Sequence, residues 1–352
     1  DQAKEAEAKY ARKDTNIRDL EGLPIAVKDA ADIEGQPLTK GSLYLKDNIS
    51  IETHYSIQRL LDAGGMVHAR TTTPEFGCSG VCDSKIHGTT HTPWKLGYTS
   101  GGSSGGSGAT LAVGSSPLAT GSDIGGSIRN PAHYCGVFGH KPTWGLIPPR
   151  GHALPGLLVQ PDLSVVGPLA RSAGDLEVGV MAMAGPDELD GVGLKLDLPT
   201  PRQTKLGDYK VAVWNNEAMA PVSSEVEERV TAVAKTISDA GGTVDFDARP
   251  DFDPAEAQNI FRTLLWSTMA ARIPDADFAE MVKSASELSP EDQSGGAQLL
   301  RIQTISHHDH FTEHNKRMRL RWAWDAFFRE YDALIAPIMA TPAFEHDQSA
   351  MG

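Results

Sequence analysis

The sequence has 352 residues, 40% of them hydrophobic and 22% charged, which is the composition of an ordinary globular protein. Its 46 acidic side chains outnumber its 32 Lys and Arg side chains, and the net charge of −14 disfavours nucleic acid as a partner. There is no run of 18 apolar residues, so no transmembrane helix is expected, and three cysteines disfavour a disulfide framework and fit a reducing compartment.

Hydrophobic periodicity and turn residues divide the chain into alternating strands and helices. In the first third of the chain we expect an exposed helix in residues 1–20, strands at 23–29 and 66–69 around a helix at 54–64, a loop at 71–99 and a buried helix starting near 109–113. A turn-rich segment at 135–143, a Pro- and Leu-rich non-helical segment at 146–168 and a helix at 173–184 should follow. The rest of the chain should form a strand–helix–strand unit at 210–214, 222–240 and 243–246, a mainly helical region at 254–326 and a strand at 334–336. This order predicts an α/β fold. Because no repeat or linker is evident, one domain over residues 1–352 is favoured over two.

A glycine- and serine-rich stretch at residues 100–130 contains two Gly-Gly-Ser units, Gly101-Gly102-Ser103 and Gly125-Gly126-Ser127. Glycine lets the backbone approach a bound atom closely, and serine adds a hydroxyl at the same point. A flexible linker would lack the apolar centre found here at residues 109–113. The stretch is therefore interpreted as a folded site rather than a linker.

Lys28 closes the apolar run that begins at Leu23. Lysine at a strand end is usually solvated. The alternative is a buried lysine whose ammonium is destabilised by desolvation, which makes a neutral amine available as a base.

Several other chemistries are less well supported. Ser103 formally matches G-x-S-x-G, but no strand is evident before it and no Asp…His pair stands out after it. The stretch lacks the lysine of a phosphate-binding loop. Cys78 and Cys82 have no second pair to complete a zinc site, and His310 and His314 lack the H-E-x-x-H pattern, so a polar helix face is favoured for the histidines. We expect no metal and no cofactor.

Several motifs in order resemble the amidase signature family. They are G-L-P-I-A-V-K-D at 22–29, G-G-S-S-G-G-S at 101–107, G-S-D-I-G-G-S-I-R at 121–129 and C-G-V-F-G-H-K-P-T at 135–143. The spacings of 75 residues from Lys28 to Ser103 and of 24 from Ser103 to Ser127 also fit. The resemblance implies a single α/β domain with a large mixed β-sheet core covered by helices on both sides. It runs through a signature core at 20–190 and weakens in a more variable, helix-rich part at 195–330.

The resemblance implies a Ser–cis-Ser–Lys triad. Ser127 would be the nucleophile, and Ser103 would bridge it to the base Lys28, with a cis peptide bond between Gly102 and Ser103. Ser104 would support this network by hydrogen bonding.

The same resemblance implies an oxyanion hole and a substrate-side loop. Backbone N–H groups of four residues would converge on the oxyanion: Ile124, Gly125, Gly126 and Ser127. Asp123 and Arg129 would hold this turn. The loop at residues 75–79 would pass beside the substrate, so the expected substrate-binding residues are Phe76, Gly77, Cys78 and Trp144.

The sequence departs from the family pattern at a few positions. Ser122 stands where Thr is usual, and Leu146 where Arg is common, and neither is expected to touch the triad. Thr92 replaces a common Asn before Pro93. The family pattern also implies a Gly-Leu-Pro-containing strand and a final helix after residue 352. The first residue is Asp1 rather than Met, so the extreme N-terminus is expected to lie outside the sequence, which does not address a signal peptide.

These observations predict an amidase that forms an acyl-enzyme on Ser127 and releases an amine or ammonia. The Pro- and Leu-rich segment at 146–166, with Phe76 and Trp144, favours an apolar or aryl amide, carbamate or ester as substrate. The expected partners are this small molecule and water, for a cytoplasmic monomer or homodimer. One alternative is an amidotransferase subunit that passes ammonia to a tRNA-linked substrate within a multi-chain complex, and another is a non-catalytic binding module on the same scaffold.

Overall fold

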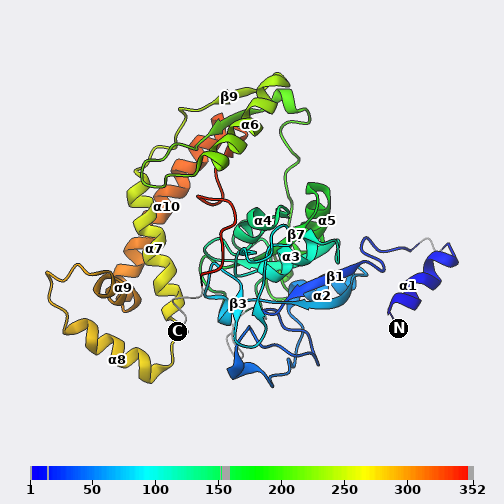
Figure 1. Cartoon of the computed structure of the whole chain (residues 1–352), viewed down its shortest axis with the longest axis horizontal. Helices are drawn as coiled ribbons and strands as arrows, with labels where there is room; N and C mark the ends of the chain where they lie inside the picture. The colour runs from blue at the N-terminus through cyan, green and yellow to red at the C-terminus, as the bar shows by residue number, and fades with distance from the viewer. Residues whose placement is uncertain (1, 14–15, 151, 153–158, 348–352) are drawn as a thin grey trace. The chain divides into compact units, whose positions relative to one another are not determined.

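The computed structural model describes residues 2–13, 16–150, 152 and 159–347. Its internal contacts divide the chain into two compact units. Unit 1 comprises residues 1–160, 164–198 and 341–352, and unit 2 comprises residues 161–163 and 199–340. Each unit combines a sheet with helices, which confirms the predicted α/β class (Figure 1). The assignment of the whole chain to one domain stays a prediction.

Unit 1 contains a mixed five-stranded sheet with the strand order β2-β1-β5-β7-β6. The strands are β1 (Pro24–Lys28), β2 (Met66–Thr71), β5 (Leu118–Asp123), β6 (Phe138–Gly139) and β7 (Val165–Ala170), and the helices are α1 (Gln2–Ala11), α2 (Tyr55–Asp62), α3 (Gly105–Ala112), α4 (Arg129–Cys135) and α5 (Ala173–Met183). A separate antiparallel hairpin pairs β3 (Asp83–Ser84) with β4 (Gly88–Thr89). Strand β1 is parallel to β2 and β5, and β7 is antiparallel to β5.

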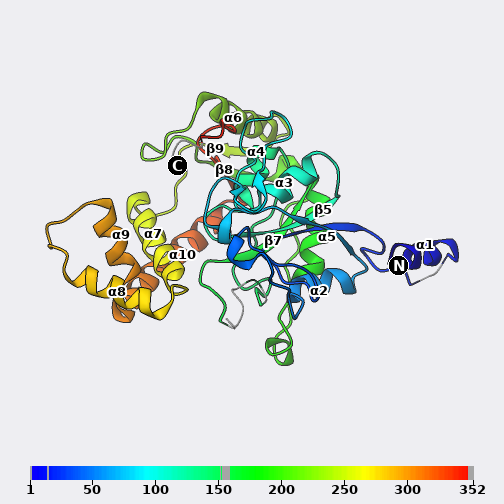
Figure 2. The same cartoon turned by 60° about the horizontal axis from the view of Figure 1, so that its bottom comes forward.

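Alternate side chains of β1 enter two different hydrophobic clusters. Ile25 and Val27 pack with side chains of α2 and α5, among them Ile57. Ala26, on the opposite face, packs with side chains of α3 and α4, among them Leu111. Successive strand residues point to opposite faces of a sheet, so helices cover both sides, as predicted (Figure 2).

Helix α3 begins at Gly105, earlier than the expected start near residue 109. Glycine costs about 1 kcal/mol in a helix interior, which hid this start in the sequence. The packing explains the glycines. A Cβ at Gly105 would lie 2.5 Å from the Cβ of Cys82, and one at Gly106 would overlap the backbone of Thr72. The first turn of α3 is therefore pressed against the chain that follows β2.

Three strands of the sheet were not predicted: β6, which lies in the segment expected to be turn-rich, and β5 and β7. β5 has the sequence Leu-Ala-Thr-Gly-Ser-Asp, and all six residues are buried. Gly and Asp are depleted in strands, and Ala to a lesser degree, so local propensity argues against this element. β7 begins near the end of the Pro- and Leu-rich segment at 146–168, which was expected to be non-helical. All six of its residues are buried. Pairing between β5 and β7 supplies the stability that propensity does not.

Unit 2 contains a parallel three-stranded sheet with the order β10-β8-β9. Its elements are β8 (Lys210–Val213), α6 (Ser224–Asp239), β9 (Thr243–Asp245), α7 (Pro254–Ala270), α8 (Asp275–Ser286), α9 (Gly295–Gln303), α10 (His307–Glu330) and β10 (Ala333–Ile335). Val213 of β8 packs against Val230 and Ala234 of α6. Helices α7 and α10 run side by side (Figure 1). The predicted strand–helix–strand unit and helical region are confirmed. None of the helices in the described ranges combines the length and apolar character needed to span a membrane.

Candidate active site

The ends of two neighbouring strands and the starts of two helices bring the predicted residues together. Lys28 is the last residue of β1, and β5 beside it ends at Asp123. Ser104 is the N-cap of α3, and Ser127 lies two residues before the start of α4. Because all four segments lie within unit 1, residues far apart in sequence share one site.

Lys28 is buried, with 2% of its surface exposed. Its Nζ lies 2.7 Å from Ser103 Oγ and 2.9 Å from Ser122 Oγ. Burial lowers the pKa of Lys28 from 10.5 to about 7, although Cys82 and Asp123 act in the opposite direction. The interpretation of Lys28 as a solvated strand end is therefore wrong, and the amine is available in neutral form near pH 7.

Ser103 is also buried, at 3% exposure, and the peptide bond between Gly102 and Ser103 is cis, as the resemblance implies. The Ser103 carbonyl oxygen accepts a hydrogen bond of 2.9 Å from Thr73 Oγ1. Thr73 was not predicted as part of the site, and nothing in the motifs points to it.

Ser104 connects the two Gly-Gly-Ser units. Its N–H donates to the Ser127 carbonyl oxygen at 3.2 Å, and its Oγ accepts from the N–H of Ser122 at 3.3 Å. Ser127 is partly exposed, and among the described residues its hydroxyl has no hydrogen-bond partner. The Lys28–Ser103 half of the expected bridge is formed, whereas the hydroxyl bond from Ser103 to Ser127 is absent. Catalytic hydrogen bonds often tighten only when substrate is bound.

Asp123 organises the turn that carries Ser127. Its carboxylate, 1% exposed, accepts from the N–H groups of Gly126 at 2.8 Å and Ile128 at 3.0 Å and pairs with the Arg129 guanidinium at 2.9 Å. Burial would raise the pKa of Asp123, but the hydrogen bond and charge of Arg129, together with the two amides, outweigh it and lower the pKa. The predicted supporting positions of Asp123 and Arg129 therefore agree with the geometry.

One of the four expected oxyanion donors is already occupied. The Gly126 N–H donates to Asp123 Oδ1, so it is engaged within the turn in this structure, and the expected set of four oxyanion donors stays a prediction. Gly126 has φ +116, a conformation that favours glycine, and its role is to let the turn form. The amides of Ile124, Gly125 and Ser127 donate to no other group in the described chain, which leaves three candidate donors.

The prediction that Ser122 does not touch the triad is wrong. Its hydroxyl, from a side chain with 7% exposure, is the second partner of the Lys28 amine. Thr120, two residues earlier in β5, places its hydroxyl 3.3 Å from the Lys28 N–H. Residues two apart in a strand lie on the same face of the sheet, so the sequence would have placed Thr120 and Ser122 on one face if β5 had been recognised as a strand.

The loop at residues 75–79 lies directly beside the bridging serine. A Cβ on Gly77 would be 3.3 Å from Ser103 Oγ. Phe76 is 43% exposed, and Cys78 is also exposed. Trp144 is 49% exposed and lies in a different segment, next to the pocket residue Gly145. The structure thus brings Gly77 to Ser103, whereas the roles of Phe76, Cys78 and Trp144 stay predictions.

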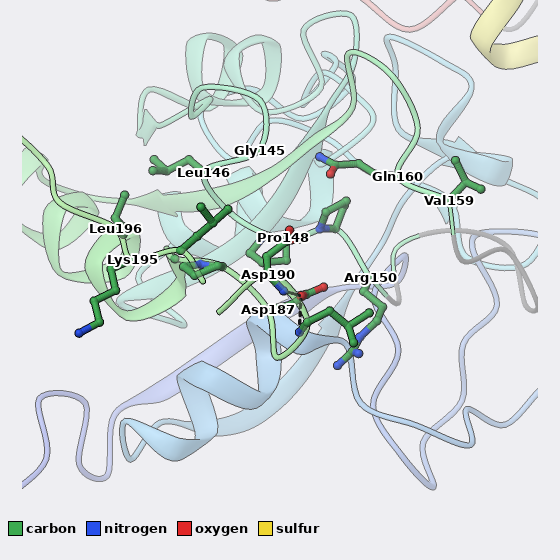
Figure 3. A pocket seen from close by; sticks show the side chains of 15 residues that line it. Gly145, Leu146, Pro148, Arg150, Val159, Gln160, Asp187, Asp190, Lys195 and Leu196 are labelled. Atoms are coloured by element: carbon green, nitrogen blue, oxygen red, sulfur yellow. Dashed lines mark hydrogen bonds between the residues drawn. The ribbon is translucent and has the colours of Figure 1, made fainter. Parts of the chain in front are cut away.

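A pocket of about 480 Å³ lies in unit 1, and its lining residues fall within 145–150, 159–160 and 185–196 (Figure 3). Leu146 and Pro148 line it, and Arg150, Asp187 and Asp190 gather at one side of it (Figure 3). The Pro- and Leu-rich segment therefore does line a pocket, although residues 151 and 153–158 lie outside the described residues. Lys28, Ser103 and Ser127 are absent from the described residues that line the pocket, so it is distinct from the triad.

No group of three His, Cys, Asp or Glu side chains within the described ranges is arranged to hold a metal ion. His314, one of the two histidines considered for a metal, lies 3.0 Å from the Arg317 guanidinium. A neighbouring cation disfavours metal binding at this position.

The family model for amidases matches residues 1–351, essentially the whole chain. An acylamidase of Rhodococcus erythropolis is 31% identical over 345 residues, which cover 94% of this chain and 68% of that protein. A glutamyl-tRNA(Gln) amidotransferase subunit of Trichodesmium erythraeum is 33% identical over 257 residues, 71% of this chain and 52% of that protein. The chain thus spans about half to two thirds of the length of these relatives.

Solved structures agree with this assignment. A structure described as part of a vestigial protein complex related to an s-triazine catabolic enzyme has a TM-score of 0.78 and 27% identity, covering 98% of this chain and 72% of that one. A bacterial aryl acylamidase of the amidase signature family has a TM-score of 0.79 at 22% identity, covering 98% of this chain and 71% of that one, and so supports the fold alone. The chain has the amidase signature fold and belongs to the amidase family of hydrolases.

Proposed function

We propose that the chain hydrolyses an amide C–N bond through an acyl-enzyme on Ser127, with Ser103 as proton relay and Lys28 as base. The observation that carries this proposal is the Lys28–Ser103 pair, in which a buried amine lies 2.7 Å from a buried hydroxyl. With its pKa lowered to about 7, the amine is neutral in a large fraction of molecules at neutral pH and accepts a proton.

In the acylation step, Ser127 Oγ attacks the amide carbon while its proton passes to Ser103 Oγ. The Ser103 proton passes at the same time to Lys28 Nζ, which becomes an ammonium. The C–N bond then breaks, and the proton returns from Lys28 through Ser103 to the leaving nitrogen, which departs as a neutral amine or ammonia. Ser122 Oγ holds the amine in place during both transfers because it is the second group within hydrogen-bond distance of Nζ.

The carbonyl oxygen becomes an oxyanion as Ser127 attacks. The amides of Ile124, Gly125 and Ser127 are the proposed donors to it, and losing one such donor typically costs about 3–4 kcal/mol of transition-state stabilisation. Water then attacks the acyl-enzyme by the same route, which releases the acid and restores Ser127. Asp123 and Arg129 act as positioning residues for the turn.

We further propose an apolar or aryl acyl compound as the substrate, whether amide, carbamate or ester. Phe76 supports this proposal because it presents a half-exposed ring next to Gly77, which lies against Ser103. Rates over anilides, aryl carbamates, aryl esters and small charged amides such as malonamate test the substrate class. Activity confined to malonamate-like amides would contradict it.

Covalent labelling tests the nucleophile. A fluorophosphonate probe is expected to label the wild-type chain at Ser127 and to leave Ser127→Ala unlabelled. Ser115→Ala, which removes an exposed hydroxyl after α3, is the matched control and should label normally. Equal labelling of Ser127→Ala, or no labelling of a chain that hydrolyses amides, would contradict the assignment.

The second candidate is a component of a multi-chain amidotransferase, which the similarity to the Trichodesmium protein favours. Such a component works together with partner chains. A purified chain that elutes alone and hydrolyses amides unaided would contradict this candidate, whereas activity that appears only with partner chains would favour it.

A further inference from the structure

A tight turn at residues 39–42, which none of the motifs includes, lies beside the 75–79 loop. The Phe76 N–H donates to the Lys40 carbonyl oxygen at 2.8 Å. Both residues have left-handed backbones, with φ 49 at Lys40 and φ 51 at Phe76. Such conformations cost about 1–3 kcal/mol each in residues other than glycine, so the surrounding contacts must maintain them.

Two further contacts join the turn to the loop. Ser42 Oγ donates to Glu75 Oε1 at 2.6 Å. Gly41 packs so closely on residues 73–74 that a Cβ there would overlap the Thr73 carbonyl oxygen. The loop in turn meets the triad, because Gly77 lies against Ser103 Oγ and Thr73 Oγ1 donates to the Ser103 carbonyl oxygen. The turn is therefore connected to the bridging serine through the loop.

The turn itself is held by Asp29, the residue after the base. The buried Asp29 carboxylate accepts from the Thr39 N–H at 3.0 Å and from the Thr39 hydroxyl. Arg70 and His87 lie 3.4 and 3.5 Å from the same carboxylate. Thr39 Oγ1 also accepts from the Gly41 N–H at 3.2 Å. One buried carboxylate thus fixes the turn to the end of β1.

We propose that Asp29 and Thr39 are positioning residues that hold Phe76 in its left-handed conformation and Gly77 beside Ser103. They act through the turn at residues 39–42 and touch neither the substrate nor the reacting atoms. Asp29 follows Lys28 directly, so the end of one strand carries both the proposed base and the anchor of the turn that contacts the 75–79 loop. The expected effect on substrate selection rests on the proposed amidase function, whereas the effect on the loop does not.

Hydrogen exchange at the Phe76 amide tests the loop directly, because this amide is protected by the bond to Lys40. In the full chain, Thr39→Val and Asp29→Asn should raise its exchange rate at least about tenfold. Thr39→Ser keeps the hydroxyl and should restore the wild-type rate. Thr92→Val is the matched control, because Thr92 is equally buried and donates to the Tyr134 carbonyl oxygen away from the loop.

Kinetics provide a second measurement that a purely structural role would not change. Thr39→Val should raise KM for an anilide several-fold and leave kcat for acetamide, which has no aryl group to contact Phe76, within about twofold. Unchanged Phe76 exchange in both variants would overturn the proposal, as would an equal kinetic loss for both substrates. If the wild-type chain hydrolyses no amide, the proposed function fails, and the exchange rates alone decide the role of Asp29 and Thr39.

Discussion

The two units contain the same local arrangement of three parallel strands. In unit 1, β1 is followed by α2 and β2 and has β5 on its other side. In unit 2, β8 is followed by α6 and β9 and has β10 on its other side. Both central strands are apolar and buried, so topology and strand burial do not distinguish the unit that carries the proposed site.

The buried polar side chains distinguish the two units. Every buried polar or charged side chain among the described residues lies in unit 1, including Lys28, Ser103 and Asp123. The buried side chains of unit 2 in the same described ranges are apolar, as at Val213 and Leu264. Buried polar groups cost free energy unless they are hydrogen-bonded. The buried polar side chains are therefore concentrated in the unit that carries the proposed site, whereas the buried side chains described in unit 2 form an apolar core.

Lys28→Met, in unit 1, should have the largest effect on activity. It should lower kcat/KM about 100- to 10,000-fold, because the proposed base is lost. The folded-state pKa of Lys28 is lowered, so below about pH 7 the native state bears the cost of a buried ammonium. The variant should therefore keep or gain unfolding free energy at pH 6 relative to wild type. A large loss of stability with unchanged activity would contradict the assignment.

Leu264→Ala should lower the stability of the protein and leave its activity unchanged, the reverse of the result expected for Lys28→Met. Leu264 is fully buried in α7, and a cavity there should cost about 2–5 kcal/mol of unfolding free energy. Below the thermal transition, kcat per labelled active site should stay at the wild-type value. Denaturant unfolding measures the unfolding free energy, and active-site titration gives kcat per active site. A loss of kcat in fully folded protein would show that the core of unit 2 also contributes to catalysis.

The pH profile should follow the Lys28 amine. With a pKa of about 7, the base is protonated below pH 7 and neutral above it. We expect kcat/KM to fall about tenfold per pH unit below pH 7 and to level off above it. A flat profile from pH 5 to pH 9 with an uncharged substrate would exclude Lys28 as the base.

Ser122→Ala should produce a smaller effect at the same amine. Loss of a hydroxyl that accepts from Nζ should lower the rate about tenfold. It should also move the pH profile to lower pH, because the ammonium loses a stabilising partner. Ser122→Thr keeps the hydroxyl and is the control. An unchanged profile in Ser122→Ala would mean that Ser103 alone holds the amine.

Metal removal should have no effect. Dialysis against EDTA should leave the rate of amide hydrolysis unchanged, because the proposed chemistry uses only side-chain and backbone groups. A loss of activity that a divalent cation restores would contradict this prediction and would show that a metal ion takes part in the reaction.

Much of the fold could be predicted from local sequence patterns. The strand ending at Lys28, the strand–helix–strand unit of unit 2 and the helical region after residue 254 all follow from periodicity and turn residues. Two of the elements that were missed, β5 and the first turn of α3, are rich in Gly and Ser. Their local propensity opposes the structure they adopt, and only pairing with β1 and β7 or close packing on Thr72 stabilises them.

The motifs and their spacings are sufficient to identify the family and to single out Lys28, Ser103 and Ser127, because ordered motifs with fixed spacings are local properties of the chain. Tertiary structure alone decided which groups share the site. It placed Ser122 on the Lys28 amine, directed the Gly126 amide to Asp123, and connected Asp29 through residues 39–42 to the loop beside Ser103. These contacts depend on strand pairing and close backbone packing between distant segments. Residue spacing along the chain does not determine such contacts.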